Sequence, residues 1–234
     1  MGIPALAREE AGGYEPPHTE SADPPIVTSR IKRLIDVAGS VALLLVVALP
    51  ALAIAIAIRL DSRGPAILRQ PRCGYRGRPF DCLKFRSMRH DADEGPHRRY
   101  VEGLVTGKAE HAVSDGVFKL VADDRVTRVG RFLRRTSLDE LPQLWNVMRG
   151  EMSLVGPRPP LPYEVELYDE RQWGRLACKP GITGLWQVSG RNTLSYRDMC
   201  ELDLEYIRNW SPWLDVRLLL RTLPVVLFNS GRAH

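Results

Sequence analysis

The most apolar part of the chain is a run of 22 residues, 37–58, that contains no charged side chain. As a straight helix this run would be about 33 Å long, and the hydrocarbon core of a bilayer is about 30 Å thick. The pattern therefore predicts a helix within a membrane.

The residues around this run favour an arrangement in which it enters the membrane and returns. Lys and Arg are in excess on the cytoplasmic side of membrane segments, so basic residues at both ends favour the same face for both ends. Pro50 near the middle favours a kink. We therefore expect a re-entrant helix over residues 30–62; the alternative is a single span kinked at Pro50. The basic residues are Arg30, Lys32 and Arg33 before the run, and Arg59, Arg63, Arg69 and Arg72 after it.

After the apolar run the pattern changes to short alternating segments. Residues 66–70 and 80–86 have the composition of strands, and Gly74 and Gly77 stand between them. This pattern predicts a small β-hairpin. Its Lys84 and Arg86 fit either a phosphate site or a solvated strand face.

Residues 89–120 are polar and have no regular apolar spacing. Their His and acidic residues stand at irregular spacing and form no calcium-type loop, so they match no metal-binding template. We interpret this stretch as a mobile surface insertion rather than a metal cluster.

An adjacent acid pair, Asp139 and Glu140, opens the next apolar pattern. Ser137 and Glu140 fit a capping box, apolar residues follow at helical spacing, and Gly150 is a plausible end of the helix. The acid pair therefore has a purely structural interpretation, as the stabilised first turn of a helix. It also has a chemical one, since a carboxylate can attack phosphorus or hold a divalent metal.

The surroundings of the acid pair favour chemistry on phosphate. Arg134 precedes it, and Arg158 follows in a stiff Gly-Pro-Arg-Pro turn at residues 156–159. Guanidinium groups match phosphate oxygens bidentately. A loop at 179–192, with three glycines beside basic residues such as Arg191, would let backbone amides approach an anion. That loop matches neither the P-loop nor the dinucleotide pattern.

The tail, residues 210–228, combines two Trp residues, two Arg residues and a dense apolar face. This composition is typical of a helix lying in the membrane interface, and a core helix is the alternative. The catalytic part would then extend over residues 63–234 on the cytoplasmic face.

Charge and cysteine content narrow the class of protein. Residues 1–29 carry one Arg against five acids and lack periodic apolar positions, which predicts a disordered acidic leader without a signal peptide. With a net charge of +5 overall and −4 in this leader, residues 30–234 carry +9, which suits a phosphate-rich partner. The four cysteines form no CxxC pair, which predicts reduced thiols. Aromatic residues make up 7% and do not alternate with basic ones along a strand, so a nucleic-acid partner is disfavoured.

Seven segments together resemble the bacterial sugar transferases, the monotopic polyprenyl-phosphate phosphoglycosyl transferases. They follow one another in uninterrupted order between about residues 30 and 228, and the resemblance is weakest across 89–120. The segments are 32–36, 84–88, 124–131, 137–146, 153–159, 179–191 and 213–215.

The resemblance implies transfer of sugar 1-phosphate from a UDP-sugar to undecaprenyl phosphate, with release of UMP, at the cytoplasmic face of the bacterial inner membrane. By position in the family motif, Asp139 would attack the β-phosphate, form a covalent phosphosugar ester and contact Mg²⁺. Glu140 would help to activate the lipid phosphate. The matching phosphate-binding residues would be Arg134, Arg158, Arg191 and Lys84. Some relatives associate as dimers, so a homodimer is a further implied partner, and the sugar stays open.

The expected fold is α+β: a re-entrant helix, interfacial amphipathic helices and a small β-hairpin closing over a site near Ser137. Two other functions remain as alternatives. One is a membrane-anchored module that binds anionic lipid without catalysis, and the other is a silent scaffold for polysaccharide assembly. Neither gives the acid pair a task.

Overall fold

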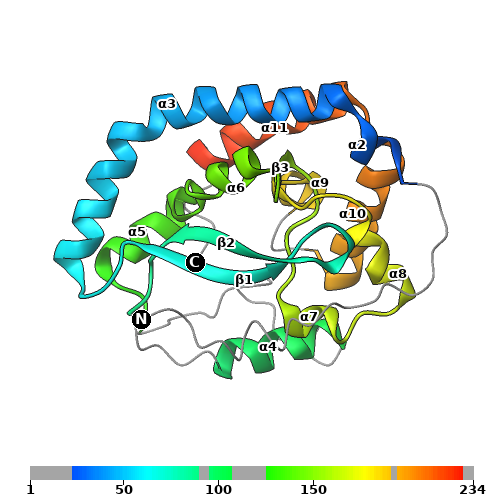
Figure 1. Ribbon diagram of the computed structural model, residues 1–234. Helices are drawn as coiled ribbons and strands as arrows, with labels where there is room; N and C mark the ends of the chain where they lie inside the picture. The colour runs from blue at the N-terminus through cyan, green and yellow to red at the C-terminus, as the bar shows by residue number, and fades with distance from the viewer. Residues whose placement is uncertain (1–22, 90–94, 107–124, 191–193, 229–234) are drawn as a thin grey trace.

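In the computed structural model of the chain, the described residues are 23–89, 95–106, 125–190 and 194–228. They combine many helices with two small two-stranded sheets, which confirms the mixed α+β prediction (Figure 1). The helices are α2 Pro25–Thr28, α3 Arg30–Asp61, α4 Gly95–Val105, α5 Arg128–Thr136, α6 Gln143–Arg149, α7 Pro162–Val165, α8 Glu170–Trp173, α9 Leu185–Ser189, α10 Tyr196–Arg208 and α11 Pro212–Phe228. The 3-10 turns are η1 Tyr75–Gly77, η2 Leu138–Glu140 and η3 Gly174–Ala177, and the strands are β1 Ile67–Cys73, β2 Pro79–Phe85, β3 Ser153–Val155 and β4 Gly181–Thr183.

The apolar run lies in α3, a single helix of 32 residues that contains Pro50. The side chain of Ser29 caps its start by accepting from the Lys32 N–H at 3.2 Å. Figure 1 shows that α3 bends part-way along, as a proline within a helix favours. Of its most apolar 18-residue window only 6% is buried, and α3 alone, among the described residues, is long and apolar enough to cross a membrane. A core helix of a soluble protein would be mostly buried, so α3 is suited to lipid.

The hairpin confirms the strand prediction. Strands β1 and β2 pair antiparallel from Ile67 opposite Phe85 to Cys73 opposite Pro79. The chain reverses at η1, where Arg76 takes a left-handed conformation with φ of 54°. Directly after β2, Arg86 donates to the carbonyl oxygens of Ser62 and Arg63, each at 2.7 Å. The hairpin is thereby fastened to the end of α3, where carbonyl groups lack partners within the helix.

Strands β3 and β4 form a parallel pair that is built on glycine. The backbones approach so closely that a Cβ atom at Gly181 would lie 2.1 Å from the Gly156 nitrogen. The Gly156 N–H donates to Thr183 O at 2.9 Å, and the Gly181 N–H donates to Pro157 O at 2.7 Å. The 179–184 part of the Gly-rich loop therefore packs against the Gly-Pro-Arg-Pro turn, and the Gly181 amide is used in that contact. Anion binding by other amides of the 179–192 loop stays a prediction.

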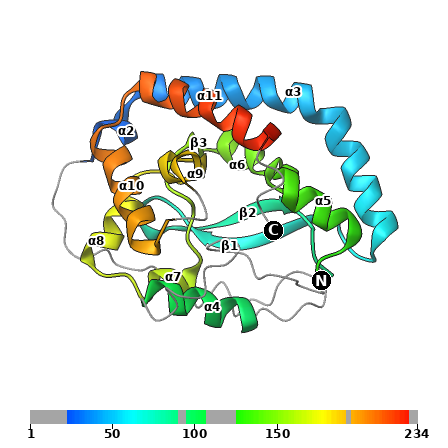
Figure 2. The same ribbon diagram turned by 180° about the vertical axis from the view of Figure 1, so that it is seen from behind.

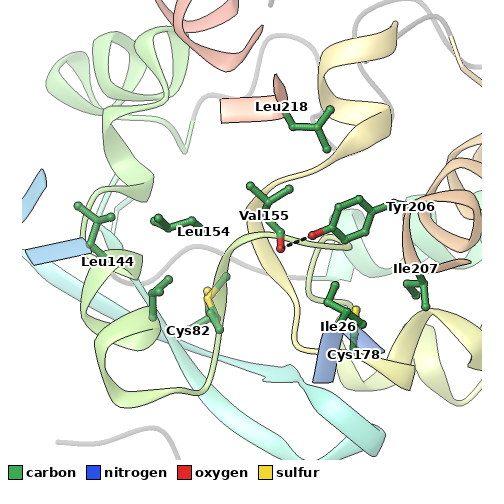
Figure 3. Close-up of a cluster of buried hydrophobic side chains, with 11 residues drawn as sticks. Ile26, Cys82, Leu144, Leu154, Val155, Cys178, Tyr206, Ile207 and Leu218 are labelled. Carbon is green, nitrogen blue, oxygen red and sulfur yellow. Dashed lines mark hydrogen bonds between the residues drawn. The ribbon is translucent and has the colours of Figure 1, made fainter. Parts of the chain in front are cut away.

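The main core lies between the hairpin, α6, β3 and α10. Figure 3 shows Cys82 of the hairpin, Leu144 of α6 and Val155 of β3 together with Tyr206 of α10. The Tyr206 hydroxyl donates to Val155 O at 3.0 Å inside this cluster. All four cysteines are free and buried, as the reduced-thiol prediction requires.

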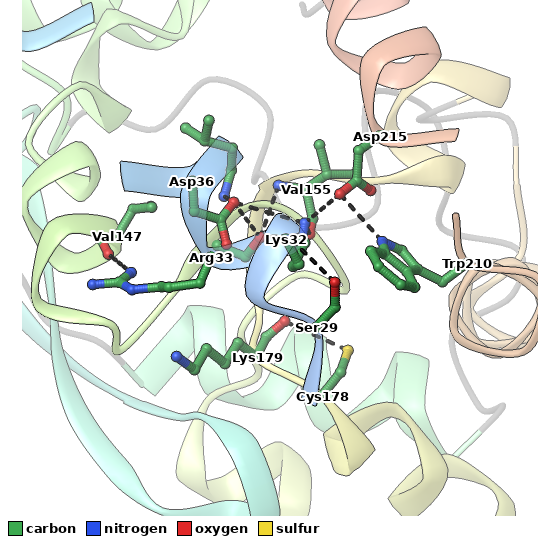
Figure 4. A network of polar contacts seen from close by, with 12 residues as sticks. Ser29, Lys32, Arg33, Asp36, Val147, Val155, Cys178, Lys179, Trp210 and Asp215 are labelled. Carbon is green, nitrogen blue, oxygen red and sulfur yellow. Dashed lines mark hydrogen bonds and ion pairs between the residues drawn. The ribbon is translucent and has the colours of Figure 1, made fainter. Parts of the chain in front are cut away.

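A buried ion network joins the start of α3 to the rest of the fold (Figure 4). The Lys32 ammonium, whose side chain is 6% exposed, lies 2.7 Å from Asp215 of α11 and 3.7 Å from Asp36 one turn along α3. It also donates to Val155 O at 2.9 Å. Asp36 in turn accepts from the Ser153 hydroxyl and the Leu154 N–H. Buried charged and polar groups of α3, β3 and α11 thus partner one another.

Helix α11 has two different faces. Asp215 and Leu218 are fully buried, whereas Trp213, Leu220 and Leu223 are exposed. Both views place α11 beside the first part of α3 (Figures 1 and 2). The helix predicted in the tail is therefore present, with one face in the core and an exposed apolar face.

Two short helices occur where the sequence predicted none. Helix α4 lies within the polar stretch 89–120, and its Val101 and Leu104 are buried. Helix α2 lies at the end of the acidic leader, and its Ile26 is buried in the main core. Both have too few apolar positions for a periodic signal; the rest of the leader, residues 1–22, lies outside the described residues.

A second buried ion pair lies beneath α10. Arg175 donates to Asp203 at 2.9 Å and to the hydroxyl groups of Tyr168 and Tyr196. Within the described residues Asp203 Oδ1 has no hydrogen-bond partner. Burial raises the pKa of Asp203 to about 6, against the opposing charge of Arg175.

We expect Lys32→Met to lower the free energy of unfolding by about 3–5 kcal/mol, because two buried carboxylates lose their cation. Thermal or denaturant unfolding in detergent measures the change. Arg30→Met, at an exposed position two residues earlier, is the control and should change stability little. An equal loss in both variants would contradict a role for the network.

The raised pKa of Asp203 predicts a dependence of stability on pH. A carboxyl group whose pKa is higher in the folded than in the unfolded state stabilises the fold below its unfolded pKa. That contribution is lost as pH rises through the folded pKa of about 6. Between pH 4 and 6 the unfolding free energy should therefore fall relative to that of Asp203→Asn. Parallel melting-temperature profiles of the two proteins would refute this.

Candidate active site

The acid pair lies in a tight turn between two helices. Ser137 ends α5 in the left-handed conformation, with φ of 57°, and Asp139 and Glu140 follow in η2. The Ser137 side chain makes no capping bond, and the next helix, α6, begins only at Gln143. The prediction of a helix capped by Ser137 is therefore wrong, because the left-handed turn and Pro142 separate Ser137 from α6. Gly150 does end α6, with φ of 80°.

The hairpin brings a lysine to the acid pair. Lys84 lies on β2, and its ammonium is 3.7 Å from a carboxylate oxygen of Glu140. The two side chains are 20% and 36% exposed. An ion pair this open to solvent contributes little to stability. The structure thus places a cation beside Glu140 at a position that a substrate can reach.

Arg158 lies next to a buried carboxylate. Glu164, in α7, is 1% exposed, and one of its oxygens lies 3.7 Å from Arg158 and 3.9 Å from Arg72. The same oxygen accepts from the Leu161 N–H at 3.1 Å. Arg72 is buried and also donates to Pro159 O at 2.8 Å. Glu164 and Arg72 therefore fix the turn that carries Arg158.

The buried thiol of Cys82 feels the charges of several of these groups. Burial raises the pKa of this thiol, the nearby carboxylate raises it further, and three cations lower it. The charges that act on it are those of Lys84, Arg72, Glu140 and Arg158. These charges come from the hairpin, from η2 and from the Gly-Pro-Arg-Pro turn.

The remaining predicted site residues are Arg134, Asp139 and Arg191. Arg134 lies half-buried in the last turn of α5, just before the acid pair. Asp139 is half-buried and adjoins Glu140 in η2. Arg191 lies outside the described residues.

The carboxylates at this site suit Mg²⁺ of the substrate-bridged kind. Mg²⁺ usually binds one or two protein carboxylates together with substrate phosphates and water. Within the described ranges no three metal-binding side chains cluster, so a closed protein cage is absent there. Asp139, with Glu140 beside it, supplies the small donor set that such binding requires.

Sequence reasoning missed Glu164 and Arg72 as neighbours of Arg158. Glu164 stands at the third position of a helix that begins with Pro162, a pattern that indicates a helix start. No local pattern connects either residue to the turn that carries Arg158.

Comparison with known proteins finds a matching family model and similar relatives. A family model described as bacterial sugar transferase matches residues 27–229. The chain is 46% identical over 201 residues to the galactosyl transferase CpsE of Streptococcus agalactiae, covering 86% of this chain but 43% of that protein. It thus spans less than half the length of this relative.

Two other relatives are matched over more of their length. The exopolysaccharide production protein ExoY of Rhizobium meliloti is 39% identical, covering 97% of this chain and 95% of that protein. The UDP-glucose:undecaprenyl-phosphate glucose-1-phosphate transferase of Caulobacter vibrioides is 41% identical, covering 87% and 72%. With a family model matching most of its length, the chain belongs to the bacterial sugar transferase family.

Proposed function

We propose that this chain transfers a sugar 1-phosphate from a UDP-sugar to undecaprenyl phosphate and releases UMP, as an early membrane step of exopolysaccharide synthesis. The observation that carries the proposal is the ion pair of Lys84 with Glu140, directly beside Asp139, in a member of this family. The name of the Caulobacter relative describes such a reaction with glucose.

In the first step a carboxylate oxygen of Asp139 bonds to the β-phosphorus of the UDP-sugar. The bond from that phosphorus to the oxygen bridging the two phosphates breaks, and UMP leaves with the electron pair. In the second step an oxygen of undecaprenyl phosphate attacks the same phosphorus and the Asp139 carboxylate is released. Two anionic substrates thereby react in succession rather than against each other, which predicts ping-pong kinetics.

In this scheme the cations of the site position the phosphates and neutralise their charge. Phosphoryl transfer depends on positioning and charge neutralisation. Arg158 offers a planar fork to phosphate oxygens; Arg72 donates to the neighbouring Pro159 O, and the Glu164 carboxylate lies 3.7 Å from the Arg158 guanidinium. Lys84 can leave Glu140 for a phosphate, since their pair is long and partly exposed. Mg²⁺, when bound through Asp139, would add charge neutralisation at the same phosphates.

The proposal includes a location. We place α3 as a re-entrant helix in the cytoplasmic leaflet of the bacterial inner membrane, supported by basic residues at both ends and by the bend in a helix containing Pro50. The headgroup of undecaprenyl phosphate lies at the membrane surface, so a helix that dips and returns holds the site at substrate height.

The test of the proposal is UMP release from a panel of UDP-sugars with undecaprenyl phosphate and Mg²⁺. Asp139→Asn should lower turnover by at least about 10³-fold, because the amide cannot form the phosphosugar ester. Without undecaprenyl phosphate, the intact protein should gain the mass of a sugar phosphate and Asp139→Asn should not. The control is Asp198→Asn, the same change at an exposed position of α10. Full activity of Asp139→Asn would sink the covalent mechanism, and a folded intact protein that is inactive with every donor would favour the scaffold function.

We expect Arg158→Lys to lower kcat/KM for the UDP-sugar by about 10- to 100-fold, because an ammonium cannot form the bidentate contact. The matched control is Arg149→Lys, an exposed arginine at the far end of α6. Both variants should keep the melting temperature within a few degrees. Equal kcat/KM for Arg158→Lys and the intact protein would remove Arg158 from the phosphate site.

A further inference from the structure

A small cleft lies at the start of α3, away from the candidate active site. Its polar lining residues are Ser29, Lys32, Arg33, Asp36, Ser153 and Lys179. The acid pair precedes the first residue of α6, whereas Arg33 contacts the last turn of the same helix. Seven helical residues separate the two places, a length of about 10 Å.

The cleft has an excess of positive charge. The ammonium of Lys32 is already engaged by Asp215 and Asp36. The carboxylate of Asp36 also accepts from the Ser153 hydroxyl and the Leu154 N–H. The charges of Arg33 and Lys179 therefore have no carboxylate of their own in the cleft.

The two remaining cations lie close together. A Cβ atom at Gly150 would be 3.5 Å from Arg33 Nη2 and 3.5 Å from Lys179 Nζ. Figure 4 shows both side chains extending in the same direction. Lys179 is half-buried, and burial followed by the charge of Arg33 lowers its pKa. Like charges at a half-buried position are unfavourable unless an anion joins them.

Lys179 is not needed to satisfy the carbonyl groups at the end of α6. Arg33 donates to Val147 O and Met148 O, each at 2.7 Å, and so satisfies the last carbonyl groups of the helix. Lys179 Nζ makes no hydrogen bond or ion pair with any described residue, although it has three N–H groups to give. Arg33 retains further N–H groups, and Ser29 retains its hydroxyl proton.

The position of the cleft indicates which kind of anion would bind there. It adjoins the first turn of α3, where Ile31 and Leu34 are exposed, and more exposed apolar side chains follow farther along this helix, among them Leu43, Leu45 and Val46. A group bound where an apolar helix enters lipid lies at the depth of the headgroups. If the bound phosphate belongs to a phospholipid, its two acyl chains lie beside α3.

We propose that Lys179, Arg33 and Ser29 form a binding site for the phosphate group of an anionic phospholipid, separate from the site for the reacting phosphates. The donors come from the loop before β4 and from the start of α3, so the bound lipid joins the two. The proposal rests on the membrane placement of α3 proposed above; it concerns binding alone and does not depend on the proposed reaction.

Native mass spectrometry of the full chain in mild detergent tests this site. The probe is phosphatidylglycerol in competition with diacylglycerol that carries the same acyl chains. We expect the intact chain to retain one phosphatidylglycerol in preference to diacylglycerol. Lys179→Gln should reduce the retained amount about tenfold, since a charge-assisted contact is lost, and Lys179→Arg should restore it. The matched control is Arg30→Gln, which removes an exposed cation one turn away that does not line the cleft.

Several results would overturn the proposal. Retention by Lys179→Gln equal to that of the intact chain would do so, and so would an equal loss in Arg30→Gln, which would indicate diffuse surface charge. A lowered melting temperature of Lys179→Gln with unchanged lipid retention would assign Lys179 to the end of α6 instead. If inorganic phosphate raised the melting temperature of the intact chain but not of Lys179→Gln, while phosphatidylglycerol showed no preference, the ligand would be free phosphate and the lipid assignment would be wrong.

Discussion

The buried ammonium of Lys32 is the contact on which the arrangement of the other elements depends. Its partners come from three separate parts of the chain: Asp36 in α3, Val155 O in β3 and Asp215 in α11. Tyr206 of α10 joins the same group by donating to Asp215 and to Val155 O. A charge buried this deeply is tolerated only when several groups satisfy it at once. The apolar helix, the parallel strand pair and the tail helix must therefore be assembled together.

The parallel strand pair connects this network to the turn that carries Arg158. Glycine at 156 and 181 lets two backbones meet, and the turn that follows carries Arg158. Beneath the turn a single buried carboxylate, Glu164, faces two arginines, of which only Arg158 approaches the surface. Glu164 and the glycine contact together set the position of Arg158.

Local sequence patterns were sufficient for elements with strong periodicity. The uncharged run became α3, the alternating segments became β1 and β2, and the tail became α11. They failed where a backbone conformation decides the outcome. Ser137 has the composition of a helix cap, yet its left-handed conformation makes it the end of α5. The glycines of 179–184 have the composition of an anion-binding loop, yet their spacing serves contact with Gly156. The partners of Arg158 are distant in sequence, and pairing over 87 residues, as between Arg72 and Pro159, leaves no local signal.

Helix α6 is short, and both of its ends are held. The acid pair adjoins its first turn, while Arg33 of α3 donates to two carbonyl oxygens of its last turn. At the other end of α3, Arg86 fastens the hairpin that carries Lys84. The two halves of the bent helix are therefore each tied to one side of the reacting centre. In the proposed membrane placement, a tilt of α3 would shift the acid pair and its lysine by different amounts, so the thickness and curvature of the surrounding lipid would become geometric variables of the candidate site.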